Sequence, residues 1–191
     1  MDNKCYECEE RSSCYDNSQC KFKEGNTFKL TFNFKREALL YDIANVAYIE
    51  GAIQRKDNEH DAHFTMDIVQ DDNVDRITRI LDRVYAQCVK HLSPYTDECI
   101  SEDLELNNDF EETDTYTIVM NVPKTFLKPF ARLIKTLINE YMVSSSLFEW
   151  LAITKPNSAE FWGVKANDTL HEIRSTLNTC SHVTERPISP I

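Results

Sequence analysis

The chain has 191 residues, 41% of them hydrophobic, and a formal net charge of −11, which fits one globular domain of ordinary size with appended segments. Such an acidic chain lacks the basic surface that nucleic-acid binding needs, and no apolar run approaches the about 20 residues of a membrane-spanning helix. The three glycines, Gly25, Gly51 and Gly163, lie too far apart for a glycine-rich phosphate loop.

Residues 1–26 are expected to form a cysteine-rich arm with the spacing C-x2-C-x5-C-x5-C. Four thiolates this close together suit a closed, tetrahedral and therefore structural zinc site. The expected ligands are Cys5, Cys8, Cys14 and Cys20. Free thiols, an iron–sulfur cluster and disulfides are the alternatives. The first residues have neither the basic start nor the apolar segment of a signal peptide, so we expect a reducing, intracellular location, which disfavours disulfides.

The region 27–180 is expected to form a single, helix-rich α+β domain. Apolar and polar residues alternate in three segments, as in half-buried strands: 27–34, 64–69 and 116–122. Apolar residues at helical spacing predict four helices, at about 36–53, 74–92, 126–155 and 157–178. The resulting order, β-α-β-α-β-α-α, predicts a small and mainly antiparallel sheet with the helices on one side.

The last two helices should fold back on each other as an antiparallel hairpin, because the connection between them is short. Pro129 fits only the first turn of the first helix, and Pro156 should end that helix, because the residue before a proline avoids helical angles. Asn157 and Glu160 have the spacing of a capping box for the second helix. The serines at 144–146 fit either a close approach of another backbone or a bend.

Two of these helices carry basic residues about one turn apart. These residues are Arg76, Arg79 and Arg83 on the one, and Lys128, Arg132 and Lys135 on the other. On an acidic protein such rows suit the docking of an acidic partner. The alternative is a solvated face with local ion pairs.

Residues 97–114 contain nine acidic residues and no lysine or arginine. A loop this long is either functional or disordered, and it lacks the order of aspartates and the glycine of a calcium loop. The tail, residues 181–191, is expected to be an extended arm. Ile188 and Ile191 have no evident place in the core, so we expect them to contact a neighbouring subunit.

The segment 126–178 resembles the helical module of head–tail connector proteins (neck or adaptor proteins) of tailed bacteriophages, in particular those of Bacteroidales. In these proteins a long helix that ends in a turn is followed by a helix of the kind found here from Ala159 to Arg174. The predicted strands and the cysteine arm depart from the all-helical form of such adaptors.

The resemblance implies a non-enzymatic virion protein, assembled in the bacterial host cytoplasm as a subunit of an oligomeric ring in the phage neck. Its partners would be copies of itself and the portal and tail proteins, with no specific nucleic-acid binding and no membrane contact. Acidic residues that face the channel of such a ring would repel DNA and let it slide. The candidates are Glu102, Asp103, Glu105, Asp109, Glu111 and Glu112.

Two other functions remain open. The chain could be an intracellular protein-binding or regulatory module that zinc stabilises through its N-terminal arm. It could also be a metal-dependent hydrolase that uses His60, His63 and the acidic loop. Against the hydrolase, the two histidines lie in a charged loop without a clear third ligand.

Overall fold

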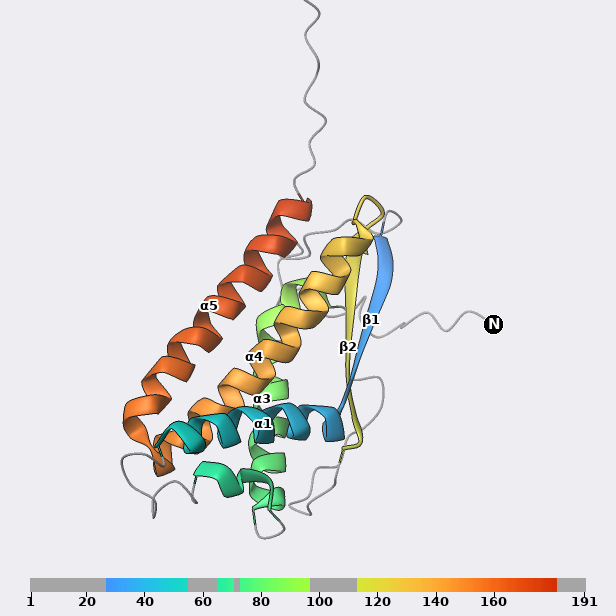
Figure 1. The fold of residues 1–191 in the computed structure, drawn as a ribbon. Helices are drawn as coiled ribbons and strands as arrows, with labels where there is room; N and C mark the ends of the chain where they lie inside the picture. The colour runs from blue at the N-terminus through green and yellow to red at the C-terminus, as the bar shows by residue number, and fades with distance from the viewer. Residues whose placement is uncertain (1–26, 55–64, 71–72, 97–112, 182–191) are drawn as a thin grey trace, which may run out of the picture.

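The computed structural model of the protein describes residues 27–54, 65–70, 73–96 and 113–181. Within these ranges the fold is α+β and rich in helices (Figure 1). The helices and strands are β1 (Thr27–Lys35), α1 (Arg36–Gln54), α3 (Val74–Leu92), β2 (Thr115–Pro123), α4 (Lys128–Thr154) and α5 (Pro156–Ser181). Two short 3-10 helices, η1 (Asp67–Val69) and η2 (Ser93–Tyr95), flank α3.

The two strands form an antiparallel ribbon in which Phe32 faces Ile118 and Phe34 faces Tyr116. Both strands were predicted from the alternation of apolar residues, and the alternation sets their orientation. The four side chains named above are buried in the core, whereas the polar residues between them, such as Asn33 and Thr117, face outward. The sheet therefore packs one face on the helices, as expected for an antiparallel sheet.

The strand predicted at 64–69 is wrong. Thr65 and Met66 are helical and lead into η1, while Phe64 lies outside the described residues. Local hydrogen bonds hold this segment: the side-chain amide of Asn73 donates to the carbonyl of Asp67 at 2.9 Å, and that of Gln70 donates to the Asp67 carboxylate at 2.7 Å. Ile68 is nevertheless fully buried, so the segment contributes to the core without joining the sheet.

Helix α4 is the centre of the fold, and it packs against α5, α3, α1 and β1. All seven residues from 141 to 147 are buried. The helix runs unbroken through the serines at 144–146, and the Ser144 hydroxyl donates to the Glu140 carbonyl one turn earlier at 2.6 Å. Small side chains at these positions let neighbouring helices come close, so the serines serve packing.

The hairpin of α4 and α5 is confirmed, with Pro129 in the first turn of α4 and the reversal at Lys155. The capping box predicted at Asn157 and Glu160 is wrong, because Pro156 is itself the first residue of α5. The Lys155 carbonyl accepts hydrogen bonds from the backbone N–H groups of Ser158 and Ala159 at 3.0 and 3.2 Å. A proline suits this position, since the first helical N–H has no partner in any case.

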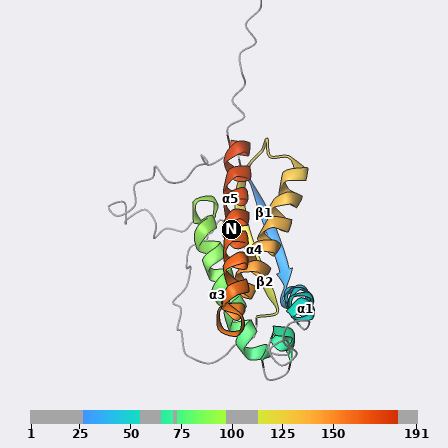
Figure 2. The same ribbon diagram turned by 60° about the vertical axis from the view of Figure 1, so that its left-hand side comes forward.

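The predicted bounds of the two other helices hold. Helix α3 ends at Leu92, just before Pro94, as predicted. Helix α1 runs through Gly51 and ends at Gln54, one residue beyond the predicted end. In Figure 2, α1 lies at the edge of the molecule, away from α3 and α5.

Candidate functional site

Helix α1 is apolar on two opposite faces. Its inner face buries Leu39, Leu40, Ile43 and Ala47 in the core, as expected for a helix that covers a sheet end. The opposite side, which we call the outer face of α1, is entirely exposed. Its members are Ala38, Tyr41, Asn45, Tyr48, Ile49, Ala52 and Ile53.

The large side chains of the outer face are unusually exposed to solvent. The exposed fractions are 71% for Tyr41, 61% for Tyr48, 52% for Ile49 and 62% for Ile53. Single exposed apolar residues are normal on protein surfaces, but a contiguous group on one helix marks an interaction site more often than not. A solvated helix face would instead carry charged residues.

The two acidic residues in the middle and end of α1 point elsewhere. Asp42 accepts a hydrogen bond from the Asn139 side chain at 3.1 Å, and Glu50 forms an ion pair with Lys155 at 3.1 Å. Both bonds tie α1 to α4 and the hairpin turn. These bonds hold both carboxylates to their own chain, and the exposed Glu37 in the first turn remains as the charged residue at the N-terminal end of the outer face.

An apolar groove of about 590 Å³ runs beside the outer face. Apolar side chains of α1 and Val69 of η1 make up most of its lining, and the charged residues Lys35 and Glu37 complete it. The groove is wide enough for an aromatic side chain from another chain, and it offers few polar groups to a small ligand.

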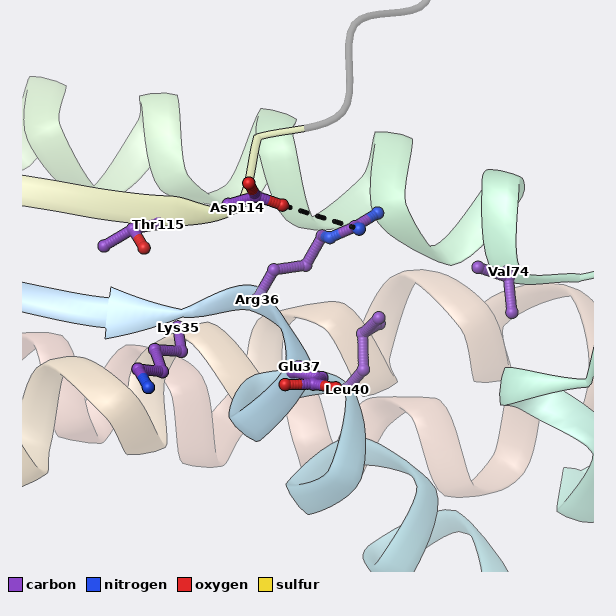
Figure 3. A pocket seen from close by; sticks show the side chains of 7 residues that line it. All are labelled: Lys35, Arg36, Glu37, Leu40, Val74, Asp114 and Thr115. Atoms are coloured by element: carbon purple, nitrogen blue, oxygen red, sulfur yellow. Dashed lines mark ion pairs between the residues drawn. The ribbon is translucent and has the colours of Figure 1, made fainter.

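A second cavity, of about 430 Å³, lies where β1 passes into α1 (Figure 3). Arg36 and Asp114 form an ion pair across it at 4.0 Å, and Val74 at the start of α3 lies on its far side (Figure 3). Asp114 is almost fully exposed, so this pair contributes little to stability. The Arg36 backbone N–H also donates to the Asp114 carbonyl at 3.0 Å, which closes the end of the ribbon. These contacts are structural.

A third cavity, of about 450 Å³, lies between α3, α4 and α5. It contains His91, whose Nδ1 lies 3.0 Å from the Arg174 guanidinium. A guanidinium can only donate, so Nδ1 accepts and the imidazole is neutral. Burial, Arg174 and Lys90 lower the pKa of His91 accordingly. The Tyr141 ring meets the imidazole edge-on with centroids 6.4 Å apart, and burial raises the pKa of its hydroxyl.

The basic residues predicted to bind a partner divide into two groups. On α3, the Arg76 guanidinium lies 5.6 Å from the ring centroid of Trp150, and Arg83 pairs with Glu149 at 2.6 Å. These two arginines therefore bind α4 of their own chain, which favours the local-pair alternative for that row; Arg79 is exposed. The residues of the α4 row, Lys128, Arg132 and Lys135, are all exposed.

Most of the remaining predicted site residues lie outside the described residues. These are Cys5, Cys8, Cys14 and Cys20, the histidines His60 and His63, the acidic residues from 102 to 112, and Ile188 and Ile191. Within the described ranges, no group of three or more histidine, cysteine or carboxylate side chains could hold a metal ion. None of the helices in those ranges combines the length and hydropathy of a membrane span.

The outer face of α1 was not identified from the sequence. The signal was present, because the helix has apolar residues at positions that cannot all face one core. No protein-family model, curated protein or solved structure matches the chain. The candidate site therefore rests on the chain's own chemistry, and the outer face of α1 is a surface whose composition solvation does not explain.

Proposed function

We propose that the protein is a non-enzymatic structural subunit that works by binding other protein chains. The observation that supports this is the outer face of α1, where four large apolar side chains are more than half exposed on one helix. Burying them against another chain removes apolar surface from water, which is the dominant favourable contribution to most protein association.

The assembly we propose is an oligomeric ring in the neck of a tailed phage, between portal and tail. The resemblance of the segment 126–178 to head–tail connector proteins supports it, and so does the exposed basic row of Lys128, Arg132 and Lys135, which suits an acidic surface on a neighbour. In this proposal the acidic residues from 102 to 112 face the DNA channel, and zinc bound by the four cysteines of the arm stabilises residues 1–26.

The test is to produce the full chain together with the portal and tail proteins of a phage whose genome encodes it, and to image the particles by cryo-electron microscopy. The proposal expects a ring of several copies attached to the portal. A double variant, Arg132→Glu with Lys135→Glu, should reduce this attachment. The matched control is Lys29→Glu, which reverses an exposed charge on β1 outside both proposed contact surfaces.

A chain that never enters a particle with any portal or tail component would contradict the neck assignment. If the same chain stayed monomeric or dimeric and bound zinc, the regulatory module would be the better proposal. Turnover of a substrate that depends on His60 and His63 would instead favour the hydrolase.

A further inference from the structure

We propose that α1 binds α1 of a second copy of the chain, antiparallel and about a two-fold axis that passes beside Asn45. The inference rests on the proposed function to the extent that both require a protein partner at this face. It goes further, because it names the partner, the symmetry and the residues that meet.

The central line of the outer face reads the same in both directions. Ala38, Tyr41, Asn45, Tyr48 and Ala52 follow one another at intervals of three and four residues, which is the spacing of the contact line in paired helices. All five are exposed. Asn45 lies at the centre, a tyrosine follows on either side, and an alanine stands at each end. Such a pattern is self-complementary when the second helix runs in the opposite direction.

An antiparallel pair brings together positions that are equally far from the axis in opposite directions. Asn45 meets Asn45 of the second copy, where two side-chain amides can each donate to and accept from the other. Tyr41 meets Ile49 of the second copy, beside Tyr48 one residue nearer the axis, and Ala38 meets Ala52. A single asparagine in an otherwise apolar helix contact is also the residue that fixes register, because any shift would bury an amide without a partner.

The groove beside the outer face provides the space that this arrangement needs. Its lining includes Ala38, Tyr41, Ala44 and Val69, together with the charged Lys35 and Glu37, and it lies on the half of α1 that precedes Asn45. The two-fold axis places Tyr48 of the second copy over this half. Each tyrosine therefore enters a groove made partly of alanine, which is the large-against-small packing of interdigitating helices.

Charge favours this face for contact between copies. Two chains of net charge −11 repel each other, and like charges brought together at an interface cost several kcal/mol. The outer face of α1 limits this cost, because Asp42 and Glu50 are bound to Asn139 and Lys155 of their own chain. The exposed Glu37 lies eight residues before Asn45, so the proposed axis places it opposite Ile53 of the second copy. Two copies can approach here without bringing carboxylates together.

The apolar area exposed on the outer face of α1 is large enough for a weak dimer. A tyrosine contributes about 150–250 Å² when fully buried, so the exposed parts of Tyr41, Tyr48, Ile49 and Ile53 amount to about 450 Å² per copy. With the alanines and Asn45, the two copies together bury about 1,000 Å², the lower bound for a specific interface. We therefore expect a dissociation constant in the micromolar range. A two-fold contact pairs only two copies, so a ring would need a further contact, for which the basic row of α4 is available.

The test is a charge exchange at the axis, measured by sedimentation velocity on the full chain. Asn45→Asp and Asn45→Lys each place two like charges face to face, and each should weaken the dimer about 100-fold or more. An equimolar mixture of the two variants should restore a dimer, because a carboxylate then faces an ammonium. Only a contact in which residue 45 meets itself gives this result. The control pair is Asn167→Asp and Asn167→Lys, the same changes at an exposed position on α5, which should leave the dimer unchanged.

Several results would overturn the inference. One is a wild-type chain that is monomeric at all concentrations, which would be the result if another segment of the same chain covered α1. Another is a dimer that persists in both Asn45 variants. A mixture that fails to restore the dimer after both variants lose it would assign the face to a contact without this symmetry. The portal experiment judges the proposed function separately. A chain that joins the particle without forming this dimer would overturn the dimer proposal and leave the proposed function standing.

Discussion

The two faces of α1 make opposite predictions for the same substitution. Ile43 on the inner face is fully buried, and Ile49 on the outer face is 52% exposed. Replacing each by alanine removes the same atoms from the same helix. Backbone propensity changes alike in both, so the difference between the two variants reports burial alone.

The expected costs follow from these exposures. Ile43→Ala leaves a cavity beside the core and should lower the free energy of unfolding by about 2–5 kcal/mol, which corresponds to a drop in Tm of about 5–15 °C for a chain of this size. Ile49→Ala loses about half of the 1.5–3 kcal/mol that full burial of such a side chain is worth. The better helix propensity of alanine offsets a few tenths of this, leaving a loss below about 1 kcal/mol.

Urea denaturation followed by circular dichroism measures both values. The protein concentration should lie well below the dissociation constant of the dimer, so that association does not add to the stability of the folded state. Self-association should show the reverse order of effects, with Ile49→Ala weakening the dimer. Equal losses of stability in the two variants, or a larger loss for Ile49→Ala, would refute the orientation of α1 on which the proposals depend.

Three further predictions concern the rest of the chain. A double-mutant cycle on Arg76 and Trp150 should give a coupling of about 0.5–1 kcal/mol, and a coupling near zero would mean that the cation and the ring do not interact. Burial raises the pKa of the Cys88 thiol to about 12, whereas the same thiol in the unfolded chain has a pKa of about 8.5 and loses its proton first. The free energy of unfolding should therefore fall as the pH rises from about 8.5 toward 12. Urea denaturation at each pH should show a shallower fall for Cys88→Ala. Purified protein should contain one zinc ion per chain by elemental analysis. The double variant Cys5→Ser with Cys8→Ser should lose the zinc without a lower Tm of the main domain. Wild-type protein without zinc would contradict the predicted site.

The sequence predicted best those elements that are long or bounded by proline. The hairpin of α4 and α5 has apolar residues over many turns, and Pro156 permits only a helix end or a first turn at the reversal. The two strands of the ribbon also alternate over seven or more residues, which leaves no helical alternative.

The error at 64–69 has a physical reason. Three apolar residues in alternate positions over six residues fit a strand, but a short apolar run is also compatible with a single helical turn. Local hydrogen bonds to Asp67, from Gln70 and Asn73, decided the conformation. Such bonds between side chain and backbone compete with sheet pairing, and composition alone does not rank them.

The binding residues were harder to predict than the fold, because a charge pattern does not show what lies across from it. Arg76 and Arg83 look like a solvent-facing row until Trp150 and Glu149 are placed opposite them. The outer face of α1 was missed for the converse reason. Apolar residues in a helix are readily assigned to a core, and only the packing shows that Tyr41 and Tyr48 have none to enter.

Sedimentation equilibrium of the full chain, alone and with the portal and tail proteins, tests most directly whether the protein works through contact with other chains. Association through α1 requires the average mass to rise from one chain toward defined multiples as the concentration increases, and a chain in which both Tyr41 and Tyr48 are replaced by serine should lose the first of these steps. A wild-type mass of one chain at every concentration and with every partner would contradict the account.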